Sequence, residues 1–334
     1  MKKNHYNYLI IIFLLTLLIL YLFNSQFIIY HVLNYTKLFI KTLFPASFVF
    51  FILSSLLLDY NFPKIISRLF HVDGIVFYVF IMSIISGFPS GSKYIKDLYN
   101  RNLITDKTAN YLITFTHFPN PIFILGPVSS LFNNKLYGFF IFISIILSNI
   151  IISFLNKPCT IEKQNNIYNN NYKSFSNNLS KAIYSSLKTI LLIYGTSLFF
   201  YLIVTIITKY IHFNLFGLIF FNGLFDLTKG IFMTSIINND IYKAIFILFF
   251  LSFGGLAINM QVKSIISDTN IKYYYFIFYR VIQFIFSIVI FMLLESWRYY
   301  IYWVSISKIR VIYFNTKFKP IWVSRVNLFY WFNF

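Results

Sequence analysis

Four short segments rich in glycine and proline interrupt otherwise apolar stretches of this 334-residue chain. They lie at 86–91, 118–127, 223–230 and 253–259, and seven of the 11 glycines fall within them. Backbone that leaves a helix inside a lipid bilayer must find hydrogen-bond partners in protein or water, so such breaks persist only where they are buried or line a cavity. Two breaks in each half of the chain therefore predict a solute site near the middle of a membrane.

The composition predicts a multi-pass membrane protein. Hydrophobic residues make up 58% of the chain and charged residues only 11%, which is too few charges for a soluble surface. The net charge of +19 does not indicate nucleic-acid binding, because the 28 basic residues are scattered between apolar segments and form no stripe. The single cysteine, Cys159, excludes an internal disulfide and any multi-cysteine metal cluster, and we expect no cofactor and no metal.

The apolar runs predict an all-α polytopic bundle. Transmembrane helices are expected at 8–23, 42–58, 108–132 with a kink, 136–155, 187–208, 244–262 with a break, and 273–295. The segments 74–91 and 213–236 fit re-entrant hairpins better. With a cytoplasmic N-terminus, most basic residues between spans face the cytoplasm, as the positive-inside rule expects, and the two hairpins enter from opposite sides. This arrangement predicts two inverted repeats, each with a re-entrant hairpin and a broken helix.

The predicted organisation has five parts. They are N-terminal transmembrane helices (1–58), a first repeat (59–155), a polar linker (156–186), a second repeat (187–295) and a basic aromatic tail (296–334). Tryptophans and tyrosines beside basic residues suit the tail to a membrane interface. An additional crossing and an atypical extension stay open as alternatives for it.

The four breaks carry recognisable motifs. Residues 86–93 read Ser-Gly-Phe-Pro-Ser-Gly-Ser-Lys, 118–126 read Phe-Pro-Asn-Pro-Ile-Phe-Ile-Leu-Gly, 223–230 read Gly-Leu-Phe-Asp-Leu-Thr-Lys-Gly, and 252–261 read Ser-Phe-Gly-Gly-Leu-Ala-Ile-Asn-Met-Gln. In this order and spacing they resemble the sporulation integral membrane proteins that carry nucleoside-recognition, or gate, domains. The repeats at 59–155 and 187–295 are then gate-like. Asp226 stands where that family usually has glutamate, and Ala257 where it has serine.

The resemblance implies an architecture like that of concentrative nucleoside transporters. In spore formers it also implies movement of dipicolinic acid across the outer forespore membrane. The positions to which it assigns solute contact are Gly87, Pro89, Ser90, Gly91, Asn120, Pro121, Asp226, Thr228, Gly254, Gly255 and Gln261.

The chemistry of the first break suits a small anion. A helix starting at Ser90 and Gly91 would present free backbone N–H groups and the positive end of its dipole, which favour a carboxylate. The hydroxyls of Ser90 and Ser92 would add donors. The alternative is that these small residues only allow helices to pack closely.

Four other side chains each have a functional and a structural interpretation. Asp226 would bind a coupling proton or cation, or orient Lys229 toward an anion, or form an ordinary ion pair near the interface. Asn120 and Gln261 could form hydrogen bonds with a carboxylate or a ring nitrogen of the solute. Alternatively, they could form hydrogen bonds with backbone groups that nearby prolines and glycines free from the helix. His117 could relay protons or serve a structural role.

The leading hypothesis is a transporter that moves a small, anionic solute, dipicolinic acid by resemblance, through alternating access during sporulation. The alternative is a non-transporting membrane scaffold needed for the spore envelope or cortex. An enzyme is not expected, because no histidine pair, carboxylate pair or nucleophile elbow has a catalytic spacing. The expected partners are membrane lipids, the solute and a coupling proton or sodium ion, with no nucleic acid; a homo-oligomer is left open.

Overall fold

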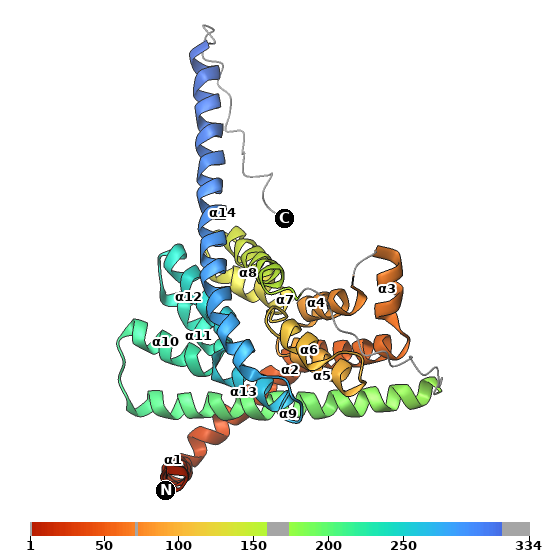
Figure 1. Cartoon of the computed structure of the whole chain (residues 1–334). Coiled ribbons are helices and arrows are strands. Elements are labelled where there is room, and N and C mark those ends of the chain that lie inside the picture. The colour runs from red at the N-terminus through yellow and green to blue at the C-terminus, as the bar shows by residue number, and fades with distance from the viewer. Residues whose placement is uncertain (1, 71–72, 159–173, 316–334) are drawn as a thin grey trace. The chain divides into compact units, whose positions relative to one another are not determined.

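All regular secondary structure described for this protein is helical, which confirms the predicted fold class. The computed structural model describes residues 2–70, 73–158 and 174–315. Its helices are α1 (Lys2–Phe23), α2 (Ser25–Asp59), α3 (Phe62–Phe70), α4 (Gly74–Ser86), α5 (Ser90–Asn100), α6 (Asp106–Leu112), α7 (Pro121–Phe123), η1 (Ile124–Val128), η2 (Ser129–Leu131), α8 (Leu136–Leu155), α9 (Phe175–Tyr210), α10 (Leu215–Phe225), α11 (Leu227–Met233), η3 (Thr234–Ile236), α12 (Asp240–Phe253), α13 (Gly255–Ile265) and α14 (Tyr273–Asn315) (Figure 1). Residues up to Phe291 form one compact unit, and Met292 begins a second.

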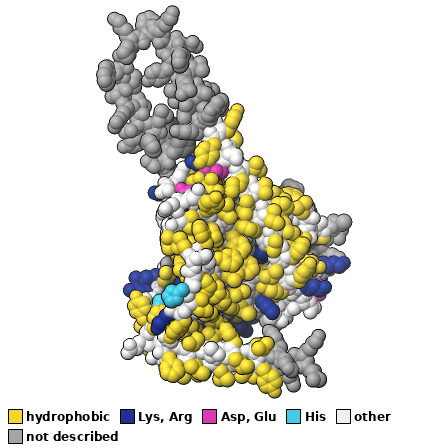
Figure 2. All heavy atoms as spheres, turned by 90° about the vertical axis from the view of Figure 1, so that its left-hand side faces the viewer, with side chains coloured by type: hydrophobic (Ala, Val, Ile, Leu, Met, Phe, Trp, Pro, Cys, Tyr) yellow, Lys and Arg dark blue, Asp and Glu magenta, His cyan; other side chains and the backbone are white. Residues whose placement is uncertain are grey.

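Several helices are long and apolar enough to cross a membrane. Within the described ranges there are five: Ser25–Asp59, Leu136–Leu155, Phe175–Tyr210, Asp240–Ile265 and Tyr273–Tyr300. The pair Phe62–Leu69 and Gly74–Ser86, bent by 109°, would make a sixth. Hydrophobic side chains cover most of the face shown in Figure 2, as expected for a surface in contact with lipid. The protein is a multi-pass membrane protein.

The last long helix of the compact unit, α14, turns its polar side chains toward the interior. On α14, the buried positions Phe276, Arg280, Gln283, Ser287 and Phe291 recur every three or four residues, which puts them on one face. Between them the outward positions are apolar and exposed. A charged or amide side chain inside an apolar span is costly in lipid, so such residues face protein.

The two halves repeat one order of elements. In the first, the long helix α2 is followed by α3, which has no counterpart in the second half, and then by the hairpin α4–α5, the interrupted segment from α6 to η2, and α8. In the second, the long helix α9 precedes the hairpin α10–α11, the interrupted pair α12–α13, and α14. The helices of each hairpin pack against each other (Figure 1). The inverted relation between the halves stays a prediction.

The long helix α2 starts well before the predicted span at 42–58. Its N-terminal half, outside the predicted span, packs against α9, which supplies partners for its polar side chains. Thr36 Oγ1 lies 2.6 Å from the hydroxyl of Tyr194, and His31 Nδ1 lies 3.1 Å from that of Tyr201. Tyr35 adds a ring contact with Tyr201 at 4.8 Å between centroids.

The single kinked helix predicted at 108–132 is wrong. After α6 ends at Leu112 the chain forms turns and then an extended stretch at 116–120, and only short helical turns follow up to Leu131. Pro119 and Pro121 explain the extended stretch, since proline disfavours helical backbone in the residue before it. The spans predicted at 42–58, 136–155, 187–208, 244–262 and 273–295 fall in helices long enough to cross a membrane, although α2, α9 and α14 extend beyond the predicted limits. The span predicted at 8–23 is helical, but the apolar helix Asn7–Phe23 is shorter than these five.

Two predicted segments are only partly described. The first twelve or so residues of α9, from Phe175, fall in the predicted linker at 156–186 and are helical. Residues 159–173, with Cys159, lie outside the described residues. The predicted tail at 296–334 continues α14 as helix to Asn315, and 316–334 lie outside the described residues.

Candidate functional site

The first hairpin, α4–α5, turns at Gly87, Phe88 and Pro89. Gly87 has φ 74° and ψ 176°, and the Phe88–Pro89 peptide bond is cis. Ser90 donates its hydroxyl hydrogen to the carbonyl of Gly87, and Ser92 donates to the carbonyl of Pro89 at 2.6 Å. Both hydroxyl hydrogens are therefore used within the turn, so the prediction that they donate to a solute is not supported by this geometry.

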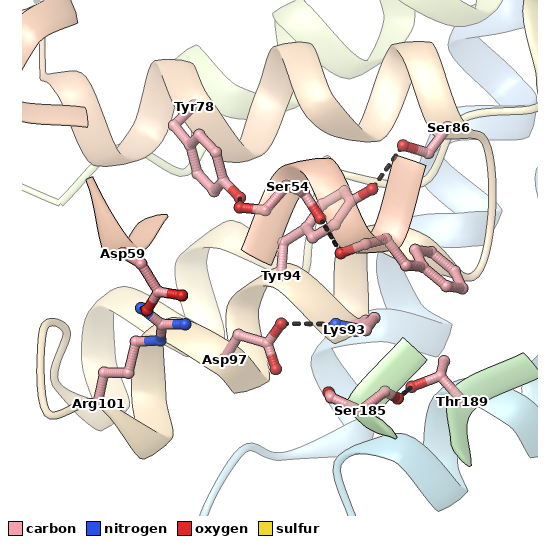
Figure 3. A network of polar contacts seen from close by, with 11 residues as sticks. Ser54, Asp59, Tyr78, Ser86, Lys93, Tyr94, Asp97, Arg101, Ser185 and Thr189 are labelled. Atoms are coloured by element: carbon pink, nitrogen blue, oxygen red, sulfur yellow. Dashed lines mark hydrogen bonds and ion pairs between the residues drawn. The ribbon is translucent and has the colours of Figure 1, made fainter. Parts of the chain in front are cut away.

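A polar network beneath the turn ties this hairpin to α2 (Figure 3). Tyr78 donates to the carbonyl of Ser54 at 2.9 Å, and Ser86 shares a 2.5 Å hydrogen bond with Tyr94 across the two arms of the hairpin. In the same view Arg101 pairs with Asp59 at 2.7 Å, and Lys93 with Asp97 at 2.7 Å. Lys93 is only 2% exposed, and Asp97 compensates its charge inside the hairpin.

Lys96, on the same hairpin, reaches the loop between α13 and α14. Its Nζ lies 2.6 Å from Asp268 Oδ1. The hydrogen bond from Lys96 lowers the pKa of the Asp268 carboxyl. Both side chains are accessible to solvent, so we assign this pair little stabilising free energy.

The tip of the first hairpin lies directly against the extended stretch at 116–120. A Cβ atom placed on Gly87 would lie 2.6 Å from the backbone nitrogen of Asn120, and one on Gly91 would lie 2.2 Å from the carbonyl oxygen of Thr116. The absence of side chains at both glycines thus allows two irregular backbone segments to touch. We call the stretch 113–120 break 1 and the Gly254–Gly255 turn break 2.

Break 2 contacts both break 1 and the second hairpin. A Cβ on Gly254 would lie 3.3 Å from His117 Nε2, and one on Gly255 would lie 3.1 Å from the carbonyl oxygen of Gly223 and 3.2 Å from the nitrogen of Leu227. The four glycine-rich segments therefore form one continuous contact in the interior, which we call the break core. This is the arrangement in which non-helical backbone is tolerated at membrane depth.

Side chains from the surrounding helices satisfy carbonyl groups that break 1 removes from helical hydrogen bonding. Asn149 donates to the carbonyl of His117 at 3.0 Å, and Gln283 donates to the same oxygen at 3.4 Å. Arg280 donates to the carbonyl of Thr114. Break 1 is thus held between α8 and α14, which supply the donors.

Break 2 relies on Asn259 in the same way. Its Nδ2 donates to the carbonyls of Phe253 at 2.8 Å and Gly255 at 2.7 Å, and its Oδ1 accepts from Tyr273 at 2.9 Å. One amide side chain thus bridges the two sides of the break and connects it to α14.

Replacing Asn259 with alanine should lower the free energy of unfolding by about 1–3 kcal/mol, because buried carbonyl groups lose their donor. Thermal unfolding in detergent measures the effect. Asn177→Ala, on the exposed first turn of α9, is the matched control and should melt like the wild type. Equal melting temperatures for Asn259→Ala and the control would show that break 2 does not depend on this bridge.

The second hairpin is closely packed at its turn. A Cβ on Gly230 would lie 2.1 Å from the Cα of Gly223. Asp226, 5% exposed, caps the N-terminus of α11 by accepting from the backbone N–H of Lys229 at 2.7 Å. The Lys229 ammonium donates to Thr205 at 3.0 Å and lies 5.3 Å from the Tyr201 ring centre. No Asp226–Lys229 ion pair occurs in the described residues, so the predicted ordinary pair is not formed.

The break core encloses a small cavity at the tip of the first hairpin. It measures about 10 Å³, and Pro89, Gly91, His117, Val262 and Phe276 are among the residues that line it. This volume is at the lower limit for one water molecule and far below the several hundred cubic ångströms of a typical ligand pocket. The cavity as the structure describes it is therefore too small to hold a solute.

The predicted site residues fall into two groups. Gly87, Pro89, Gly91, Asn120, Gly254 and Gly255 meet in the break core, and Ser90 and Asp226 lie at the turns of the two hairpins. Pro121 directly follows Asn120, and the backbone N–H of Thr228 donates to Asp226, whereas Gln261 is not shown in contact with the other predicted site residues. Pro121 opens α7, Thr228 lies in the first turn of α11, and Gln261 turns away to donate to Ser197 of α9 at 2.7 Å.

Asn120 has a structural partner of its own. It accepts from the N–H of Ile122 at 2.8 Å and reaches the carbonyl of Ser86 at 3.5 Å. It therefore caps the short helix after break 1, which matches the structural alternative of the two interpretations. Gln261, by contrast, lies within helix α13.

Sequence reasoning missed Arg280. It is 1% exposed and lies inside the span Tyr273–Tyr300, where its guanidinium contacts break 1. A detectable signal was present, because an arginine within a predicted apolar span at 273–295 is rare and points to a functional role.

Comparison with known proteins supports the membrane and sporulation context. No family model matches the chain, and no solved structure does. The chain is similar to the sporulation integral membrane protein YlbJ of Bacillus subtilis (strain 168). The two are 25% identical over 303 residues, covering 76% of this chain and 74% of that protein.

Proposed function

We propose that this protein transports a small anionic solute across a membrane during sporulation, by alternating access. The observation that carries the proposal is the break core, in which two hairpins and two interrupted segments meet, with a small cavity between the tip of the first hairpin and break 1. Transporters place solutes where helices are broken, because free backbone groups and helix ends there can bind them. The similarity to a sporulation integral membrane protein supports the context.

Dipicolinic acid is the candidate solute, carried over from the family that the motifs resemble. The proposed location is the outer forespore membrane. The first turn of α5, at Gly91 and Ser92, lines the cavity, and a helix N-terminus favours an anion. The cavity at about 10 Å³ must enlarge before a solute enters, as alternating access requires.

The hydrogen bonds of the core favour one alternative, a non-transporting scaffold for the spore envelope or cortex. Ser90, Asn120 and Gln261 all bond to groups of the protein itself. A scaffold needs such bonds only to stabilise its fold. Arg280, however, is a buried cation that has no ion-pair partner among the described residues. A scaffold does not require such a cation, so Arg280 favours the transporter.

Uptake of labelled dipicolinate into proteoliposomes tests the proposal. Under an imposed proton gradient, and separately a sodium gradient, wild-type protein should accumulate the label well above protein-free liposomes. A labelled nucleoside serves as the comparison solute. Well-folded protein that accumulates neither solute under either gradient would favour the scaffold.

A further inference from the structure

Arg280 is a buried cation for which the described residues provide no negative partner. It is 1% exposed, and it forms no ion pair with any described aspartate or glutamate. A guanidinium inside a membrane protein normally pairs with a carboxylate or faces a water-filled cavity, because an uncompensated charge is costly there.

Neutral groups satisfy only part of this guanidinium. Nη1 donates to Gln283 and Nη2 donates to the carbonyl of Thr114, while Nε has no hydrogen-bond partner within the described ranges. Phe276 contributes a ring face 5.1 Å from the guanidinium carbon. A guanidinium has five N–H donors, so these two hydrogen bonds leave donor capacity for a ligand.

Phe276, whose ring the guanidinium contacts, is one of the residues that line the cavity of the break core. Phe276 and His117 both line that cavity, and their rings meet edge to face at 5.2 Å between centroids. The His117 ring also stacks on Phe88 of the first hairpin at 4.7 Å, and its buried Nε2 has no hydrogen-bond partner in the described part of the chain. Two side chains with unused polar atoms thus adjoin the place where the first hairpin would open.

We propose that Arg280 is the residue that binds the carboxylate of the transported solute. The proposal rests on the proposed function and names the residue that gives the site its charge preference. A guanidinium offers two parallel N–H donors that match a carboxylate, which an ammonium cannot reproduce. The incoming carboxylate neutralises the buried charge, and the first turn of α5, at Gly91 and Ser92, also lines the cavity.

Equilibrium binding to purified protein in detergent tests this assignment. The probes are dipicolinate and pyridine-2,6-dicarboxamide, which has the same shape without the charge. Wild-type protein should bind dipicolinate and not the diamide. Arg280→Gln should abolish dipicolinate binding. Arg280→Lys keeps the positive charge but loses the two parallel N–H donors, and should weaken dipicolinate binding by roughly a hundredfold.

Ser287→Ala is the matched control. Ser287 is buried on the same face of α14, and its hydroxyl bonds within its own helix to Phe284, so its removal should leave binding unchanged. Arg280→Gln also removes a hydrogen-bond donor from the Thr114 carbonyl. If that variant fails to fold, dipicolinate binding by Arg280→Lys tests the assignment. Inorganic phosphate, tested alongside, should bind more weakly than dipicolinate.

Unchanged dipicolinate binding by folded Arg280→Lys and Arg280→Gln would overturn the assignment, and so would equal binding of the diamide or tighter binding of phosphate. Failure of the proposed function gives a different result. In that case the wild type binds dipicolinate in an Arg280-dependent way but no solute accumulates in proteoliposomes.

Discussion

Replacing Gly87 with alanine is expected to lower the free energy of unfolding by about 3 kcal/mol or more, one of the two largest effects we predict. Two costs add at this position. The backbone has φ 74° and ψ 176°, a region that residues with a side chain rarely adopt. The new Cβ would also lie 2.6 Å from the backbone nitrogen of Asn120, so the hairpin turn must move away from break 1.

Thermal unfolding in detergent, followed by size-exclusion chromatography, measures this loss. Gly195→Ala is the matched control, because Gly195 lies inside α9 and a Cβ atom placed there would meet no neighbouring atom within 4 Å. That variant should melt at or above the wild-type temperature, since alanine favours a helix over glycine by about 1 kcal/mol. If the two variants melt together, the hairpin turn does not contact break 1 as the structure shows.

Replacing Asp226 with asparagine is expected to reduce gradient-driven dipicolinate uptake at least tenfold while the fold is retained. Asparagine keeps the side-chain oxygen that accepts from the N–H of Lys229, and it is as good an N-cap as aspartate. What changes is the charge. The Lys229 ammonium, held by the neutral groups of Thr205 and Tyr201, then loses the nearby carboxylate, and the second hairpin loses its protonatable group.

Asp240→Asn is the control for that experiment. It makes the same chemical change in the first turn of α12, at the opposite end of this helix from break 2, where Asp240 lies 3.2 Å from Lys243. Uptake by this variant should equal that of the wild type. Normal uptake by Asp226→Asn would remove Asp226 from any role in coupling, whereas loss of uptake in both variants would indicate a general sensitivity to charge.

The positions of the hairpins and breaks could be predicted from the sequence because glycine and proline act locally. The sequence predicts hairpins at 74–91 and 213–236, and a break within 244–262. The structure has turns at Gly87–Pro89 and Asp226 and an αL glycine at Gly254. The predicted hairpin ends at 91, whereas in the structure its second arm continues as α5 to Asn100. Lys93 in this arm is buried, and Asp97 four residues on compensates its charge.

The multi-pass membrane character, most of the helical segments and the glycine-rich places where helices break follow from the amino-acid sequence, because hydropathy and backbone preferences are properties of short segments. The partners of the polar groups depend instead on the tertiary structure. Ser90 bonds to its own turn, Gln261 reaches α9, and Asn259 bridges break 2. Arg280 contacts Thr114, 166 residues away in the chain. No local pattern specifies such partners, because they are set by the packing of distant helices around the break core.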